Sequence, residues 1–194
     1  MEITNINQLD LNKVYTYTDY LLWKFSEKIE LLKGRILKMS PAPSRKHQEI
    51  LRIINRRFDA YFYQQQCNMY FAPFDVRLPK KGETEIYTVV QPDLCVVCDE
   101  SKLDERGCLG APDLIVEILS PGNSKKEMKD KFEIYQEAGV REYWMVYPLD
   151  EMVLINVLED GGYHTQNPIV DDWVTSRIFP ELKIHTDEIF EQKK

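Results

Sequence analysis

Two acidic residues interrupt stretches of sequence that are otherwise apolar. Asp93 lies between Val90 and Val97, and Glu117 lies within the run LIVEIL. An ionised carboxylate buried without a partner costs several kcal/mol, so such groups are normally paired or bound to a metal. If the two stretches form neighbouring strands, the carboxylates stand about one strand spacing apart, ~5 Å, which suits two oxygens that hold one divalent cation. Such a cation also relieves the repulsion by which two close carboxylates raise each other's pKa.

A structural interpretation of the same residues stays open. Asp93 can cap a turn after Pro92, and Glu117 can form an ion pair with a lysine. Asp113 is a rival ligand, because it too follows a proline and shares the strand face of Glu117. Four residues at about 3.3 Å each put it roughly 13 Å away, too far to share one ion. We therefore expect Asp113 to cap the entrance of its strand.

The order of the elements that must carry these acids predicts a mixed α/β sheet with helices on its faces. A helix over about 45–65 is indicated by the Ser44 cap and by apolar residues at helical spacing: Ile50, Ile53, Ile54, Phe58, Tyr61 and Phe62. A second helix over about 125–138 begins with the capping box of Ser124 and Glu127 and ends at Gly139. Strands are expected at 69–78, 87–97, 112–119, 141–147 and 152–158.

Two additions precede this core. Thr18 is expected to cap a short helix over about 19–27, whose inward-facing residues are Tyr20, Leu21, Leu22 and Phe25. Residues 28–39 predict two short strands around a turn at Lys33 and Gly34. We expect a single domain over 1–194, with an N-terminal extension over 1–43, a core over about 44–160 and a C-terminal extension with further β-structure over 161–194.

Composition and cysteine content limit the class of protein. With 194 residues, of which 43% are hydrophobic, the chain has the material for one globular domain and is not disordered. Its first residues lack a signal peptide, and it has no run of about 18 apolar residues, so we expect a cytoplasmic protein without a membrane span. Cys67, Cys95, Cys98 and Cys108 are therefore expected as reduced thiols. Cys95 and Cys98 fall on opposite faces of a strand, and without a second pair they do not predict a zinc site.

The charge of the chain is uneven. Residues 1–97 carry 14 basic and 11 acidic residues, whereas residues 98–194 carry 11 basic and 21 acidic residues, and the net charge is -7. An acidic chain does not hold nucleic acid by bulk charge, so binding has to be local and helped by a cation. The basic residues that could contact phosphates, or simply face solvent, form three groups: Lys33, Arg35 and Lys38; Arg45, Lys46, Arg52, Arg56 and Arg57; and Lys80 and Lys81.

Several of these features occur together in one known family. The ordered motifs are Q-P-D at 91–93, P-D-L-I-V-E-I-L-S-P at 112–121, and then Lys131, Tyr135, Gly139, Val140 and Glu142-Tyr143-Trp144, with Glu30, Gly34, Pro41 and His47 upstream. Over about residues 15–160 the chain resembles the Uma-two family of restriction-endonuclease-like proteins, within the PD-(D/E)xK nuclease superfamily. The resemblance implies the same restriction-endonuclease-like α-β-β-β-α-β core.

The resemblance also implies roles for individual residues. Asp93 and Glu117 would be the metal-binding acids. In the mechanism that we expect, the backbone carbonyl of Ile118 joins them in holding the cofactor, Mg2+ or Mn2+. The superfamily usually places a lysine two residues after the acid, where this chain has Leu119. Lys131 matches the lysine that the family carries on the following helix, so Asp93, Glu117 and Lys131 are the expected catalytic residues. The alternative for Lys131 is a surface ion pair with Glu127, four residues earlier.

Three further residues are candidates for supporting roles. Glu30 could be an outer-shell carboxylate of the metal site, His47 could contact a phosphate or cap its helix, and Gln91 could steer a water molecule. For each of the three, a purely structural role is an equally good interpretation of the sequence.

The first functional hypothesis is a Mg2+-dependent endonuclease that hydrolyses phosphodiester bonds, with DNA as the partner. The cation would polarise the scissile phosphate, Lys131 would orient or deprotonate the attacking water, and Arg45, Arg52 and Arg56 could position the backbone. A homodimer would suit cleavage of two strands. The alternative is a catalytically inactive nucleic-acid-binding or assembly module in which Leu119 marks the loss of the motif lysine. A third hypothesis is a metal-dependent hydrolase of small phosphodiesters.

Overall fold

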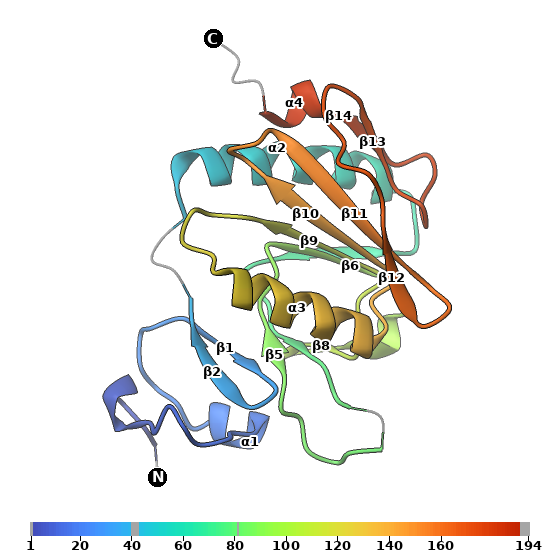
Figure 1. Ribbon diagram of the computed structural model, residues 1–194. Helices are drawn as coiled ribbons and strands as arrows, with labels where there is room; N and C mark the ends of the chain where they lie inside the picture. The colour runs from blue at the N-terminus through green and yellow to red at the C-terminus, as the bar shows by residue number, and fades with distance from the viewer. Residues whose placement is uncertain (1, 40–42, 81, 191–194) are drawn as a thin grey trace.

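The computed structural model describes residues 2–39, 43–80 and 82–190, which form two six-stranded sheets, a two-stranded sheet and flanking helices (Figure 1). Pro41 of the family pattern and Lys81 of the basic groups lie outside the described residues. Within the described part of the chain, none of the helices combines the length and the apolar character needed to cross a lipid bilayer.

The central sheet has the strand order β12-β11-β10-β9-β6-β3. Its strands are β3 (Asn68–Phe71), β6 (Leu94–Val97), β9 (Leu114–Ile118), β10 (Glu142–Tyr147), β11 (Met152–Glu159) and β12 (Gly162–Thr165). β9 and β10 run parallel and the other neighbours run antiparallel, which makes the sheet mixed. With the two long helices, α2 (Arg45–Phe62) and α3 (Lys125–Ala138), the chain order is α2-β3-β6-β9-α3-β10. The predicted α-β-β-β-α-β core is thus confirmed.

The second sheet joins the N-terminal hairpin to short strands from the middle of the chain. Its order is β2-β1-β5-β4-β8-β7. The strands are β1 (Ile29–Leu32), β2 (Arg35–Lys38), β4 (Val76–Arg77), β5 (Val89–Val90), β7 (Leu103–Asp104) and β8 (Gly107–Leu109). The remaining elements are η1 (Ile6–Gln8), α1 (Tyr17–Tyr20), η2 (Glu100–Lys102), β13 (Trp173–Thr175), β14 (Lys183–His185) and α4 (Thr186–Phe190).

The two long helices cover opposite faces of the central sheet and begin as predicted. Ser44 Oγ accepts the His47 amide at the start of α2, and Ser124 Oγ accepts the Glu127 amide at the start of α3. The apolar side of α2 buries Phe58 against Trp144, while α3 packs on the other face through its buried residues Ile134 and Tyr135. α2 ends at Phe62, three residues earlier than expected, and α3 has the expected bounds.

Three other expectations about local structure were wrong. The predicted strands 69–78 and 87–97 are each divided between the two sheets, because Pro73 and Pro92 interrupt them and a proline has no amide to donate to a strand neighbour. The short N-terminal helix is a single turn capped by Thr16 rather than Thr18. As a result Leu21 and Leu22, which were expected to face inward, are exposed.

The cysteines also differ from the expectation of four reduced thiols. Cys67 and Cys98 form a disulfide, whereas Cys95 and Cys108 are free and buried. The register of β3 and β6 explains the pairing, since Asn68 lies opposite Val97 and the next residues outward are the two cysteines. Cys95 packs on the α3 side of the sheet and Cys98 on the α2 side, on opposite faces as predicted.

Candidate active site

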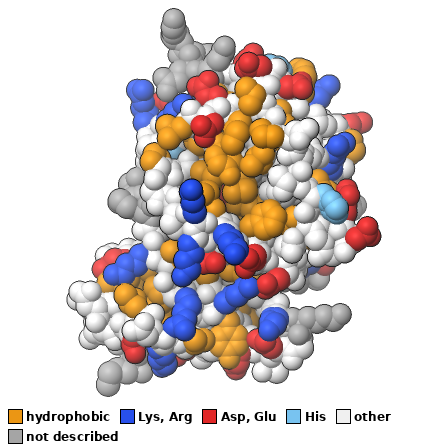
Figure 2. All heavy atoms as spheres, viewed as in Figure 1, with side chains coloured by type: hydrophobic (Ala, Val, Ile, Leu, Met, Phe, Trp, Pro, Cys, Tyr) orange, Lys and Arg blue, Asp and Glu red, His pale blue; other side chains and the backbone are white. Residues whose placement is uncertain are grey.

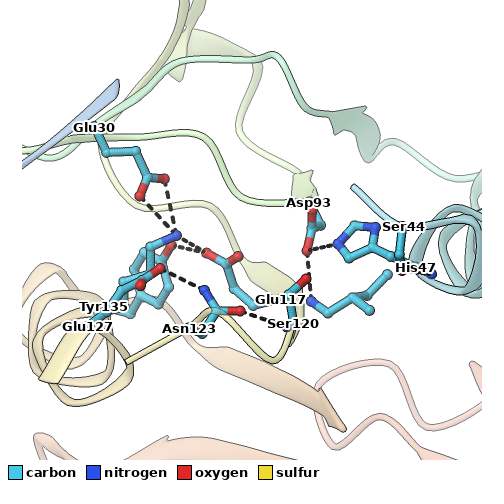
Figure 3. A network of polar contacts seen from close by, with 11 residues as sticks. Glu30, Ser44, His47, Asp93, Glu117, Ser120, Asn123, Glu127 and Tyr135 are labelled. Atoms are coloured by element: carbon cyan, nitrogen blue, oxygen red, sulfur yellow. Dashed lines mark hydrogen bonds and ion pairs between the residues drawn. The ribbon is translucent and has the colours of Figure 1, made fainter. Parts of the chain in front are cut away.

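The pairing of β6 with β9 brings the two interrupting acids together. Leu94 lies opposite Val116 in this antiparallel pair, so one step further along each strand places Asp93 opposite Glu117 on the same face of the sheet. Figure 3 shows the two carboxylates between the start of α2, marked by Ser44 and His47, and the loop before α3, marked by Ser120 and Asn123. The condition on which the metal hypothesis depended, that the strands are neighbours, is therefore met.

Glu117 is held from the side of α3. Its Oε1 accepts hydrogen bonds from Lys131 Nζ at 2.9 Å and from the Tyr135 hydroxyl at 2.7 Å. The pKa of Glu117 is raised to about 7, first by burial and then by the charges of Asp93 and Glu30, which together outweigh the lowering effect of Lys131. Lys131 and Tyr135 are four residues apart on α3 and so lie on the same side of the helix, facing the sheet.

Lys131 forms a buried ion pair with a second carboxylate, which comes from the N-terminal hairpin. Its Nζ lies 3.1 Å from Glu30 Oε1 and 3.1 Å from Glu30 Oε2. Burial alone would lower the pKa of Lys131, but the charges of Glu117 and Glu30 outweigh that effect and raise it. The alternative for Lys131, a surface ion pair with Glu127, is not observed. Lys131 is buried, and Glu127 instead accepts a hydrogen bond from the side-chain amide of Asn123.

Asp93 is held from the side of α2. Its Oδ2 accepts the Ile118 amide at 2.7 Å and lies 3.2 Å from His47 Nε2. Burial alone would lower the pKa of His47, but the hydrogen bond and charge of Asp93, then Glu117 and the Ile118 backbone, raise it. The Ile118 amide faces Asp93, and in an antiparallel pair the N–H and C=O of one residue point to the same neighbouring strand. The Ile118 carbonyl, the expected third ligand, therefore faces the side of Asp93.

Each of the two acids keeps one oxygen without a hydrogen bond to any described residue, namely Asp93 Oδ1 and Glu117 Oε2. Two carboxylates suit Mg2+, which keeps several waters and rarely needs an all-protein cage. The absence of three converging His, Cys, Asp or Glu ligands, in the ranges that the structure describes, is compatible with such a site. The residues present thus fit a divalent cation held by Asp93, Glu117 and the Ile118 carbonyl.

Gln91 extends the network toward the N-terminal segment. Its backbone amide donates to Glu30 Oε1 at 2.7 Å, and its side chain donates to Asp75 Oδ1 at 2.8 Å. Tyr20, from α1, lies 3.4 Å from the same Asp75 oxygen. Gln91 thus anchors the segment before Asp93 and does not contact the two acids. No motif or spacing in the sequence connects Asp75 and Tyr20 to the site. Tyr135 is part of the family pattern, but the sequence predicted no role for it.

Other candidate residues lie away from the site. Asp113 accepts the Cys98 amide and pairs with Arg141, which is the structural role expected of it. At 3.6 residues per turn, Arg45, Arg52 and Arg56 lie about 140–180° around α2 from His47. They line a hollow between α2 and α4, on the side of the helix opposite the site. The expectation that this face positions the substrate backbone is therefore not supported.

Comparison with known proteins agrees with this geometry. A family model described as "Putative restriction endonuclease", Uma2, matches residues 17–187. The chain belongs to the Uma2 family. A solved structure described as "a putative nuclease belonging to DUF820 from Anabaena variabilis ATCC 29413" is similar with a TM-score of 0.71, covering 90% of this chain and 97% of that chain at 20% identity. No curated protein matches the chain.

These similarities support two statements. The mixed α/β architecture of this Uma2 protein is a nuclease-like fold, and its family points to a nuclease-like hydrolase. The matched region, 17–187, runs from α1 to α4, so it includes both the N-terminal hairpin with Glu30 and the C-terminal strands.

Proposed function

We propose that this Uma2 protein is a Mg2+-dependent endonuclease that hydrolyses phosphodiester bonds of DNA. The observation that carries the proposal is the placement of Asp93 opposite Glu117, beside the ammonium of Lys131. Each of the two acids has one oxygen that receives no hydrogen bond from the described residues. A bound divalent cation would polarise the scissile phosphate and offset the charge that develops in the transition state.

The charges around the site favour a divalent cation. Glu30, Asp93 and Glu117 carry three negative charges when ionised, and Lys131 carries one positive charge in contact with two of them. Two negative charges remain, before any charge on His47 is counted. A largely buried group of carboxylates with this excess repels an anionic phosphate unless a cation is bound, because like charges that are withdrawn from water interact strongly.

Lys131 is suited to stabilise charge rather than to accept a proton. Its pKa is raised by the carboxylates of Glu117 and Glu30, so it stays an ammonium at neutral pH. An amine that deprotonates water would need a lowered pKa. Of the two tasks first considered for Lys131, we therefore drop deprotonation. Because Glu30 and Glu117 already surround its ammonium, we propose that Lys131 acts through its positive charge.

DNA as the substrate is supported by lysines at the N-terminal end of α3, which begins at the site. Lys125 and Lys126 are exposed and occupy the first turn of the helix. The N-terminus of a helix carries partial positive charge, which adds to that of the lysines. Figure 2 shows lysine and arginine side chains gathered over α3 and the β1–β2 hairpin. We propose that this basic surface contacts phosphates next to the scissile bond.

The inactive binding or assembly module is favoured by one observation, the presence of Leu119 where the superfamily motif has its lysine. Lys131 weakens this alternative because its ammonium contacts Glu117 from the next helix. An inactive nucleic-acid-binding module would bind nucleic acid just as the nuclease does, so only a test of catalysis separates these two hypotheses.

The test is nicking of supercoiled plasmid with Mg2+, Mn2+ or EDTA by the wild type and by Glu117→Gln. We expect cleavage that needs a divalent cation and falls at least about 100-fold in the variant, a loss typical of removing one catalytic electrostatic group. The matched control is Glu137→Gln, which neutralises an exposed residue of α3. Linear product would indicate two sites acting together, as a symmetric dimer provides.

Three outcomes would contradict the proposal. Equal nicking by the wild type and Glu117→Gln would point to a contaminating nuclease. No nicking with either cation would favour the inactive module. Hydrolysis of a small phosphodiester such as bis-p-nitrophenyl phosphate, with none of DNA, would support the third hypothesis.

A further inference from the structure

Glu30 differs from the other acids of the site in its origin. It lies on β1 of the second sheet, whereas Asp93 directly precedes β6 and Glu117 lies on β9, two neighbouring strands of the central sheet. Its side chain is only 1% exposed. Both of its carboxylate oxygens lie 3.1 Å from Lys131 Nζ, and Oε1 also accepts the Gln91 amide. Figure 3 shows the side chain of Glu30 reaching toward Glu117.

The position of Lys131 between two carboxylates has a consequence for Glu117. An ammonium has three hydrogens to donate. Two oxygens of Glu30 and one oxygen of Glu117 surround Lys131 Nζ, and the Tyr135 hydroxyl bonds to that same Glu117 oxygen. Glu117 Oε2 is thereby left without a hydrogen bond from the described residues. Among the described residues, only Glu30 and Glu117 form ion pairs with Lys131. Without Glu30, the ammonium could therefore bridge both oxygens of Glu117.

We propose that Glu30 is a positioning residue that holds the Lys131 ammonium on one oxygen of Glu117 and so keeps the other oxygen available to a divalent cation. This inference rests on the proposed function, since it assigns a purpose to the hairpin within the same site. It gives Glu30 a different task from that of an outer-shell ligand, because its contacts are to Lys131 and Gln91.

The hairpin is attached to the segment that carries Asp93, which makes such positioning reproducible. Gln91 donates its amide to Glu30 and lies two residues before Asp93. The Gln91 side chain is fixed in turn by Asp75, which lies just before β4. The distance between Glu30 and the two metal-binding candidates is therefore set by short links within one network.

The test is the affinity of the full-length protein for Mn2+, measured by calorimetry without DNA, in a double-mutant cycle of Glu30→Gln and Lys131→Met. Glu30→Gln leaves a neutral pair of Lys131 and Glu117, so we expect the fold to remain. We expect it to weaken Mn2+ binding at least about tenfold, the scale typical of residues that orient a metal ligand. In the Lys131→Met background the same substitution should have a much smaller effect, because no ammonium is left to compete for Glu117.

The charge-matched control is Asp75→Asn. Asp75 is close enough to Glu30 for the two to repel each other, but its hydrogen bonds are to Gln91 and Tyr20 and not to Lys131. Asparagine keeps a side-chain oxygen that can accept the hydrogen bond from the side-chain amide of Gln91. We expect a loss of Mn2+ affinity clearly smaller than that of Glu30→Gln.

The outcomes separate this inference from the proposed function. If Glu30→Gln weakens Mn2+ binding equally with and without Lys131, or no more than Asp75→Asn does, Glu30 acts only through its charge and the inference is wrong. If the wild type binds no Mn2+, the proposed function itself fails. Should Glu30→Gln not fold, Glu30→Asp keeps the charge with a side chain one methylene shorter: weaker Mn2+ binding supports positioning, and unchanged binding overturns it.

Discussion

The carboxylate of Asp93 accepts the backbone amide of Ile118, the residue directly after Glu117, at 2.7 Å. This bond fixes the side chain of Asp93 to the backbone directly next to Glu117. The two acids therefore keep their separation for as long as β6 and β9 stay paired. A site that is rigid before the ligand arrives loses less conformational freedom on binding.

His47 is expected to act on Asp93 from the first turn of α2. Its Nε2 lies 3.2 Å from Asp93 Oδ2, and its ring is buried. Mutation of a residue that hydrogen-bonds to a metal ligand typically lowers metal affinity or activity by about 10–100-fold. We expect His47→Ala to weaken Mn2+ binding on that scale. Lys46→Ala, which removes a half-buried neighbour that pairs with Glu151 and not with Asp93, should not. Unchanged affinity in His47→Ala would restrict His47 to a packing role.

The stability of the cation-free protein should fall as the pH rises between about 5 and 8. Burial raises the pKa of Glu117 to about 7, and the neighbouring carboxylates raise that of His47. In both cases the folded state binds protons that the unfolded chain has already released, so stability decreases with pH. Thermal melting in EDTA at several pH values measures this decrease. Glu117→Gln should make the dependence shallower, and stability that rises over the same range would contradict the assignment.

The contribution of the α3 lysines to DNA binding can be measured through its salt dependence. Neutralising one phosphate contact should reduce the slope of log affinity against log salt by about 0.9 for duplex DNA. We expect the double variant Lys125→Gln with Lys126→Gln to reduce the slope by the amount that corresponds to one or two lost phosphate contacts. The control is Arg52→Gln with Arg56→Gln on the far side of α2, which should leave the slope unchanged. A reduced slope in the arginine variant alone would indicate that DNA binds at the hollow between α2 and α4.

Glu142 anchors the C-terminal segment to the central sheet and should be important for stability. This carboxylate, fully buried in β10, accepts the Ser176 hydroxyl, the Trp144 indole and the amides of Arg177 and Ile178. Each buried donor left unpaired costs about 1–3 kcal/mol. We expect Glu142→Ala to lower the free energy of unfolding by at least about 3 kcal/mol in denaturant titrations. The control Glu181→Ala, at an exposed position, should change the free energy of unfolding little. If Glu142→Ala changes it equally little, the anchor is dispensable.

Much of the central framework could be predicted from the sequence. The caps at Ser44 and Ser124 and the apolar spacing of the helices are local signals, and they placed α2 and α3 within a few residues. Asp93 and Glu117 could be recognised as candidates from the sequence, because a charged residue within an apolar strand is uncommon. Local signals misled where a proline divided a strand between two sheets, since periodicity alone does not say which sheet a strand joins.

The sequence by itself determined which residues could do chemistry: two acids in apolar strands, a lysine in the next helix and the order of elements that carries them. Only the tertiary structure decided their partners, because register and helix packing bring together residues that are far apart in the chain. Strand pairing placed Asp93 opposite Glu117 and Cys67 next to Cys98. The approach of the N-terminal hairpin to α3 placed Glu30 on Lys131, 101 residues away, a contact that no spacing rule encodes.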